Sequence, residues 1–157
     1  GPFRKELVRG KMRIVKMGPE HVPQIAKLEK LCFSDPWSEK SIASELQNPL
    51  ALWLVAEEDG RVLGYVGSQT VLDESDMMNI AVDLGYRRQG IARALIEALI
   101  SALAEGDSRC LRLEVRVSNE NARALYESMG FQKLGLRKNY YHNPMEDGLI
   151  LGKEWET

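Results

Sequence analysis

The chain has 157 residues, and 21 basic against 23 acidic side chains give it a formal net charge of −2. Its 44% hydrophobic and 28% charged residues are the balance of a folded globular protein and exclude a disordered chain. No uncharged apolar run approaches the roughly 18–20 residues of a membrane span, and the near-neutral charge disfavours direct nucleic-acid binding. The few cysteines and histidines lack zinc-ligand spacing, so we expect no metal, no membrane partner and a reducing, cytoplasmic location.

Residues 1–11 are set apart from the rest of the sequence. They begin with Gly1-Pro2, which is typical of a cleaved purification tag, and they precede Met12, which has the position of a native start. We therefore expect 1–11 to be a tag remnant or a flexible N-terminal extension and 12–157 to form a single domain.

The predicted secondary structure alternates between strands and helices. In chain order it comprises a strand at 12–16, helices at 19–32 and 38–46, strands at 52–57, 62–69 and 76–82, a helix at 92–103, a strand at 111–117, a helix at 119–129 and closing strands at 131–136 and 149–151. Ser38 and Asn119 are expected N-caps, and Gly130 fits the left-handed end of the last helix. Asp59-Gly60 predicts a hairpin turn, and the closing strands flank a loop rich in Tyr, Asn and Pro.

The order of these elements predicts the fold class. The strand–helix–strand unit over 76–117 implies one parallel pair of strands with a right-handed crossover. The remaining strands follow one another through turns, so we expect them to pair antiparallel. The class that follows is α+β, with a central mixed, mostly antiparallel sheet flanked by helices.

The first candidate site is the loop between the strand at 76–82 and the helix that follows it. Its Arg87-x-x-Gly90-x-Ala92 pattern places arginines and small residues where a helix N-terminus leaves backbone N–H groups unpaired. Such a loop can cradle a phosphate, although the Walker and dinucleotide-binding glycine patterns are absent. On spacing alone, an anion site and an ordinary turn with a basic tip are equally supported.

Two further segments carry candidate catalytic side chains. On the strand at 111–117, Glu114 alternates with apolar residues and is a candidate general base on a face open to solvent or to a cleft. Its neighbours on that face are Arg112 and Arg116, and a carboxylate balanced by two arginines on a solvated face is the commoner arrangement. Tyr126 lies one position off the apolar stripe of the last helix, where its hydroxyl either reaches a groove or is satisfied at the edge of the core.

Taken together, these segments resemble the GNAT superfamily of acetyl-CoA-dependent N-acetyltransferases. The pattern Arg87-x-x-Gly90-x-Ala92 matches the pyrophosphate loop of that family, and the order Asn119…Ala122…Leu125-Tyr126…Gly130-Phe131 matches its C-terminal signature. A narrower similarity is to the RimI-type N-α-acetyltransferases, which modify the N-terminal alanine of small-subunit ribosomal protein eighteen. It rests on residues 36–40, 79–82, 113–116, 125–128 and 137–141.

The resemblance implies where the substrates bind. It implies that one parallel pair of strands is splayed and that the pantetheine arm of acetyl-CoA lies between them. The implied cofactor contacts are the backbone of Ile80, Ala81 and Val82, the pyrophosphate loop of Arg87, Arg88, Gln89, Gly90, Ile91, Ala92 and Arg93, and Asn119. The implied catalytic pair is Glu114 as general base and Tyr126 as general acid, and the implied peptide groove is flanked by Pro36, Trp37, Tyr140 and Tyr141.

The resemblance also implies the type of reaction. It requires no cysteine nucleophile, so we expect direct acetyl transfer in a ternary complex, onto the N-terminus of a ribosomal protein or another peptide. The alternatives are a related enzyme that acetylates a small-molecule amine or a lysine side chain, and a non-catalytic acyl-CoA-binding regulator.

Overall fold

The computed structural model describes residues 11–156, so the expectation for residues 1–10 lies outside the described residues. The strands are β1 Arg13–Lys16, β2 Ala51–Glu58, β3 Arg61–Val71, β4 Glu74–Val82, β5 Cys110–Arg116, β6 Gln132–Tyr141 and β7 Glu146–Glu154. The helices are α1 Val22–Cys32, α2 Glu39–Ser44, α3 Ile91–Glu105 and α4 Glu120–Ser128, with short 3-10 helices η1 Pro19–His21, η2 Glu45–Gln47 and η3 Leu84–Tyr86. No helix in this part of the chain is long and apolar enough to cross a membrane.

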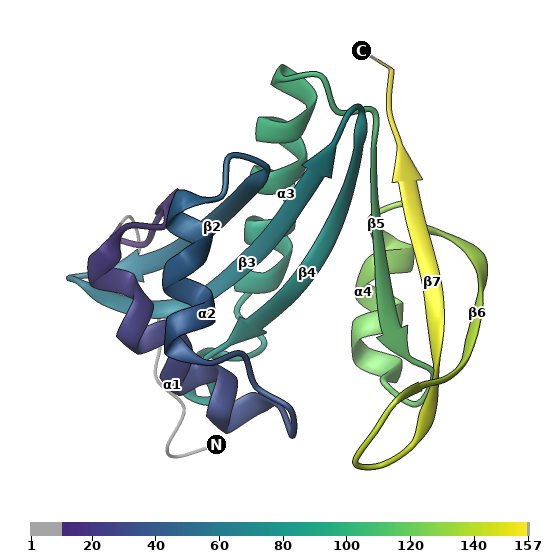
Figure 1. Ribbon diagram of the computed structural model, residues 1–157, viewed down its shortest axis with the longest axis horizontal. Helices are drawn as coiled ribbons and strands as arrows, with labels where there is room; N and C mark the ends of the chain where they lie inside the picture. Colours follow the sequence, from purple (N-terminus) through teal and green to yellow (C-terminus); the bar gives the residue numbers. More distant parts are fainter. Residues whose placement is uncertain (1–10, 157) are drawn as a thin grey trace.

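The described strands form one seven-stranded sheet in the order β1-β2-β3-β4-β5-β7-β6 (Figure 1). All neighbours run antiparallel except β4 and β5, so the predicted α+β fold with a mixed, mostly antiparallel sheet is confirmed. Helices α1 and α2 cover one face of the sheet over β2 to β4, while α3 and α4 lie on the opposite face (Figure 1). Each face has its own hydrophobic cluster, so the core is divided by the sheet into two layers.

Side chains and one glycine fix the predicted ends of the helices. Ser38 Oγ accepts a hydrogen bond from Ser41 N at 3.0 Å, and Asn119 Oδ1 accepts one from Ala122 N at 3.2 Å. Both residues therefore cap a helix as predicted. Gly130 has a φ of 90°, which confirms the left-handed residue expected after α4.

The C-terminal strands differ from the prediction. Strands β6 and β7 extend well beyond the short closing strands expected, and only residues 142–145 connect them. The expectation that Tyr140 and Tyr141 lie in a loop is wrong, because both residues end β6 and Tyr141 pairs with Glu146. Two register shifts interrupt the pairing of β6, so its sequence lacks the regular alternation by which a strand is recognised. Strand β7 also inserts between β5 and β6, an order that the sequence does not predict.

Strands β4 and β5 pair at one end only. Their parallel ladder joins residues 74–76 to residues 110–112, and beyond it the two strands diverge (Figure 1). We call the diverging part the splay: residues 77–82 of β4 and 113–116 of β5 do not pair with each other there. The sheet therefore has an interruption at its centre rather than at an edge.

A buried chain of hydroxyl groups fixes the paired end of β4 and β5. Ser75 Oγ lies 2.7 Å from Thr70 Oγ1 and 2.6 Å from Ser108 Oγ, and both serines are buried. Ser108 Oγ also donates to Cys110 O at 3.1 Å, and Trp155 Nε1 donates to Ser108 O at 2.8 Å. Because a buried hydroxyl is costly without a partner, this network ties the start of β5 to β3, β4 and the C-terminal segment.

The packing between the sheet and α2 predicts the effect of adding one methyl group. A Cβ atom at Gly67 would overlap three ring atoms of Trp53, which is only 2% exposed and stacks on Tyr65 at 5.9 Å. We expect Gly67→Ala to lower the free energy of unfolding by about 1–3 kcal/mol, because the indole has no space into which to move. Gly135→Ala is the matched control, since its Cβ would meet Ile150 at an ordinary 3.6 Å. Denaturant unfolding measures both, and equal stabilities would contradict the packing described.

Candidate active site

The splay leaves one edge of β4 open. In an antiparallel pair, successive residues alternate between facing the partner strand and facing away from it. Asp83 N donates to Leu63 O of β3 at 2.8 Å, so by alternation Ala81 also faces β3. The N–H and C=O groups of Ile80 and Val82 then face the splay. Of the three residues expected to contact a cofactor through their backbone, two therefore present polar groups there and Ala81 does not.

The loop after β4 leads directly into the N-terminus of α3. Asp83 Oδ1 accepts a hydrogen bond from Gly85 N at 2.8 Å, and Arg88 and Gly90 adopt positive φ angles of 64° and 80°. Gly90 is the N-cap of α3, and a Cβ atom there would meet no atom within 4 Å. The backbone is therefore bare where the unpaired N–H groups of a 15-residue helix begin. This arrangement fits the pyrophosphate of the expected cofactor.

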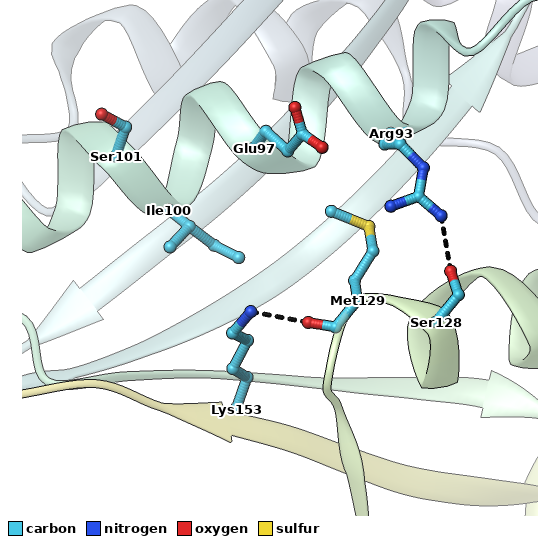
Figure 2. A pocket seen from close by; sticks show the side chains of 7 residues that line it. All are labelled: Arg93, Glu97, Ile100, Ser101, Ser128, Met129 and Lys153. Carbon is cyan, nitrogen blue, oxygen red and sulfur yellow. Dashed lines mark hydrogen bonds between the residues drawn. The ribbon is translucent and has the colours of Figure 1, made fainter.

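A hollow of 390 Å³ lies between α3 and the end of α4, on the face opposite α1 and α2 (Figure 2). Arg93, the last residue expected to bind pyrophosphate, lines it and donates to Ser128 Oγ at 2.5 Å. Lys153 Nζ donates to Met129 O at 2.6 Å on the other side of the hollow. These two contacts join α3, the end of α4 and β7 around the hollow.

Glu114 lies on β5 within the splay and keeps a 25% exposed side chain. The alternation predicted for β5 is confirmed, because its apolar residues are buried and Glu114 lies on the other face. Its ionic partner is not a neighbour on the strand: Arg137 Nε of β6 donates to Glu114 Oε1 at 3.0 Å. Arg112 instead pairs with Glu74 and Asp76. The expectation that two flanking arginines balance Glu114 is therefore corrected, since strand β6 supplies the cation.

Tyr126 is the most buried residue of α4, with 5% of its surface exposed. The structure places it within the apolar stripe rather than beside it, with its ring 5.6 Å from the ring of Phe131. Burial raises the pKa of its hydroxyl to about 12, so the phenol keeps its proton at neutral pH. The charge of Tyr126 also adds to the raised pKa of the Tyr141 hydroxyl. A protonated donor is thus held in an apolar environment.

Tyr140 and Tyr141 form a perpendicular pair at the end of β6, with ring centroids 4.9 Å apart. Both lie over Gly148, where a Cβ atom would come within 3.1–3.3 Å of their side chains. The Arg116 guanidinium lies 4.6 Å from the Tyr141 ring, and burial raises the pKa of both tyrosines, with the Glu114 charge adding to it. The aromatic pair is therefore adjacent to the Glu114 carboxylate.

The connection between β6 and β7 is held by Glu146. Its two carboxylate oxygens accept hydrogen bonds from Ser118 N at 2.6 Å and Ser118 Oγ at 2.9 Å, and Arg116 Nη1 lies at 3.4 Å. Arg116 also donates to the carbonyl oxygens of His142 and Pro144. These hydrogen bonds, above all the one from the Ser118 hydroxyl, lower the pKa of the Glu146 carboxyl. The aromatic pair is thus fixed to the loop that precedes α4.

The predicted site residues fall into three groups around the splay. The end of β4, the loop into α3 and the start of α3 and α4 carry the residues expected to bind the cofactor: Ile80, Val82, Arg88, Gln89, Gly90, Ile91, Ala92, Arg93 and Asn119. Strand β5 and helix α4 carry Glu114 and Tyr126. The α1–α2 loop and the end of β6, at the end of the sheet where β4 and β5 diverge, carry Pro36, Trp37, Tyr140 and Tyr141. Arg87 stands apart, because its guanidinium is directed toward Cys32 Sγ of α1 at 4.0 Å. The described residues contain no group of three His, Cys, Asp or Glu side chains placed to hold a metal ion.

Two residues to which the sequence analysis assigned no role, Glu29 and Asn79, contact each other next to the open edge of β4. Glu29 is completely buried, and Asn79 Nδ2 donates to both of its carboxylate oxygens. A signal for Glu29 was present, since it lies four residues after Ile25 and shares the buried side of α1 with it. A carboxylate in that stripe is an exception to the amphipathic pattern.

Comparison with known proteins identifies relatives over nearly the whole chain. A protein-family signature described as "Acetyltransferase (GNAT) family" matches residues 22–131. The [ribosomal protein bS18]-alanine N-acetyltransferase of Escherichia coli (strain K12) is 43% identical over 127 residues, which are 81% of this chain and 84% of that protein. A Bacillus subtilis (strain 168) protein named as a candidate for the same activity is 39% identical over 96% of this chain and 98% of its own length. The crystal structure of the Escherichia coli ribosomal-protein-S18-alanine N-acetyltransferase superposes with a TM-score of 0.85 at 38% identity, covering 93% of this chain and 95% of that one.

The lowered pKa of Glu146 predicts a pH-dependent contribution to stability. A carboxyl with a lowered pKa in the folded state stabilises the protein above its unfolded pKa of about 4.3, and this contribution disappears as the pH falls through the folded value. We therefore expect Glu146→Gln to lower the melting temperature at about pH 7 and to differ little from the wild type near pH 3. Glu97→Gln, an exposed carboxyl on α3, is the control. A deficit of the same size at both pH values would contradict the role of the ionised carboxylate.

Proposed function

Because this chain belongs to the acetyltransferase (GNAT) family, whose acetyl donor is acetyl-CoA, we propose that it acetylates the α-amine of an N-terminal alanine, that of ribosomal protein bS18. The observation that carries this proposal is the splay, whose open β4 edge continues into a bare helix N-terminus and is flanked by Glu114 and Tyr126. The named activity of relatives that are about two-fifths identical supports the choice of substrate. A ribosomal substrate implies that the reaction takes place in the cytoplasm.

The backbone of the chain has the groups needed to hold the cofactor. When bound, acetyl-CoA supplies an acetyl thioester that is open to attack by an amine. The C=O group of Ile80 and the N–H and C=O groups of Val82 hydrogen-bond its pantetheine arm as a neighbouring strand would, while the Ile80 N–H donates to Asn79 Oδ1. The turn at Gly90 binds its pyrophosphate. Asn119 Oδ1 is occupied by the helix cap, so its contact with the cofactor comes from Nδ2.

Glu114 receives the proton of the amine in this proposal. An N-terminal amine has an unperturbed pKa of about 7.7–8.0, against about 10.4 for lysine. A carboxylate therefore removes the proton of an N-terminal amine more easily than that of a lysine, because more of the N-terminal amine is already deprotonated at slightly alkaline pH. Arg137 occupies Glu114 in the structure, and the incoming ammonium group replaces it as the cationic partner. Ion pairing thus brings the amine to the splay before its proton is removed.

Tyr126 donates the proton that the departing sulfur atom requires. With a pKa of about 12, its hydroxyl is protonated throughout the physiological range and is a hydrogen-bond donor at every turnover. Its position on α4 is on the face of the sheet opposite Glu114, so proton acceptor and proton donor lie on opposite sides of the splay. The proton that Glu114 accepts from the amine is therefore not the proton that Tyr126 donates to the sulfur atom.

The aromatic residues at the open end of the splay select an extended peptide. Trp37 lies on the loop between α1 and α2, and Tyr140 and Tyr141 lie at the end of β6; both segments are at the end where β4 and β5 diverge (Figure 1). Aromatic rings with polar edges suit a peptide backbone, because they offer apolar contact and hydrogen bonds together. A free amino acid lacks the residues that would occupy this region.

Two matched peptides test the function. Both carry the N-terminal sequence of bS18 from the same organism, one with a free α-amine and the other already α-acetylated. We expect thiol release from acetyl-CoA with the first peptide only, because only its amine is available. Equal release with both peptides would assign the activity to a lysine side chain, and release with neither, despite cofactor binding, would contradict peptide acetylation.

The role of Tyr126 predicts a selective loss of turnover. We expect Tyr126→Phe to lower kcat by roughly 10²–10⁴-fold, the usual contribution of general acid catalysis. The KM for acetyl-CoA should change little, because the ring and its packing on Phe131 are retained. Steady-state kinetics at saturating peptide measure both constants. An unchanged kcat would remove Tyr126 from the proton-donating role.

A further inference from the structure

Glu29 on α1 is a buried carboxyl that the proposed chemistry does not use. It is 0% exposed, and among residues 11–156 it forms no ion pair. Burial raises the pKa of its carboxyl, while the Asn79 amide, the Tyr65 hydroxyl and the Trp37 backbone each act to lower it. A neutral side chain of the same shape would be cheaper to bury. Packing alone therefore does not account for a carboxyl at this position.

Asn79 connects Glu29 to the open edge of β4. Its Nδ2 donates to Glu29 Oε1 at 2.6 Å and to Oε2 at 2.9 Å, while its Oδ1 accepts from Ile80 N at 3.2 Å. Ile80 is one of the two residues whose N–H faces the splay. The residue before Asn79, Met78, is bulged out of the ladder between β3 and β4. The β4 backbone is thus irregular just where the Asn79 amide holds it.

The chemistry of a carboxylate sets the orientation of this amide. An ionised carboxylate only accepts hydrogen bonds, so Glu29 selects the orientation in which Asn79 Nδ2 points toward it and Oδ1 points toward Ile80 N. A glutamine at the same position both donates and accepts. With its single acceptor oxygen it can take only one of the two hydrogen bonds that Asn79 Nδ2 donates, so the Asn79 amide would be held less firmly and its Oδ1 would be less well fixed at Ile80.

Glu29 also lies beneath the loop that carries Trp37. The rings of Trp37 and Trp53 meet at 5.3 Å, and Trp53 stacks on Tyr65 at 5.9 Å. Tyr65 is completely buried, and the nearby Glu29 carboxyl contributes to the raised pKa of its hydroxyl. Glu29 therefore lies close both to the loop that carries Trp37 and to strand β4.

We infer that Glu29 is a positioning residue for acetyl transfer: through the Asn79 amide it fixes the β4 backbone at Ile80, beneath the loop that carries Trp37. It touches neither the acetyl group nor the amine, and it acts only through Asn79. This inference rests on the proposed function, because it assigns the β4 backbone at Ile80 to the site of transfer. It differs from a stabilising role, for which glutamine would serve at least as well.

Kinetics of Glu29→Gln, Asn79→Ala and the double variant test this inference. We expect Glu29→Gln to lower kcat at least about tenfold, as small misplacements at a reacting centre do. The KM values should change less than about threefold, and the melting temperature should stay equal or rise because a buried charge is removed. If Glu29 acts through Asn79, the double variant should be within about twofold of Asn79→Ala alone.

Glu45→Gln is the matched control. It makes the same chemical change at a partly buried carboxyl that accepts a hydrogen bond from Trp53 Nε1 at 3.3 Å but has no bond to β4. Its kcat should remain within about twofold of the wild type. A wild-type kcat for Glu29→Gln, or additive losses in the double variant, would overturn the inference.

Hydrogen exchange at the Ile80 amide gives a readout that needs no substrate. We expect exchange at this amide to be several-fold faster in Glu29→Gln than in the wild type, and unchanged in Glu45→Gln. If the wild type acetylates no peptide, the proposed function fails while this measurement still decides on Glu29. Identical exchange rates in the wild type and Glu29→Gln would overturn the positioning role.

Discussion

The short parallel ladder between β4 and β5 is the constraint on which the rest of the molecule depends. Three residues on each strand hold the two halves of the sheet together, and the buried Ser75–Ser108 hydrogen bond fixes that junction. Beyond the junction the strands diverge, so the hydrogen-bonding groups of β4 face a space that no strand within residues 11–156 fills. Had the ladder continued, those groups would be paired and the edge would be closed. Had it been absent, the two halves would share no backbone contact between β4 and β5.

Several irregular features of the chain lie next to the splay. Arg88 and Gly90 have left-handed backbone conformations, Met78 is bulged, and the Glu29 carboxyl is buried without a cation. The left-handed conformation of Arg88 and the buried carboxyl of Glu29 each cost stability, whereas glycine adopts the conformation of Gly90 without strain. Proteins retain such costs where a site must be held in one geometry. These features lie in the same region as the motifs, although left-handed residues also occur elsewhere in the chain, at Asp59, Leu72, Asn139 and Asn143.

Much of the fold could be predicted because its elements are locally encoded. The caps at Ser38 and Asn119 and the alternation around Glu114 are consequences of single side chains and of periodicity, and each is present as expected. Strand β6 escaped prediction because its register shifts remove the period-two pattern. The position of β7 between β5 and β6 depends on which edges remain open after folding, and no local pattern contains that information.

The candidate site divides in the same way. The loop at Gly90 is visible in the sequence because glycine permits both its backbone angle and close approach. The pairing of Glu114 with Arg137 joins residues 23 positions apart, and that of Glu29 with Asn79 joins residues 50 positions apart. Only the folded sheet brings such residues together. From the sequence alone, several other arginines and amides are equally plausible partners for Glu114 and Glu29.

Binding of acetyl-CoA at the interrupted sheet would also couple the stability of the protein to the concentration of its acetyl donor. A ligand that binds only the folded state adds RT ln(1 + [L]/Kd) to its stability, about 2.7 kcal/mol at a hundredfold excess over Kd. Acetyl-CoA held between β4 and β5 would join two half-sheets whose strands otherwise share three residue pairs of ladder, so the ligand would bridge the shortest ladder of the described sheet. In starved cells, where the acetyl donor is scarce, the enzyme population would become more open to unfolding and proteolysis. The same cleft that admits the donor would thereby make enzyme abundance follow nutrient supply.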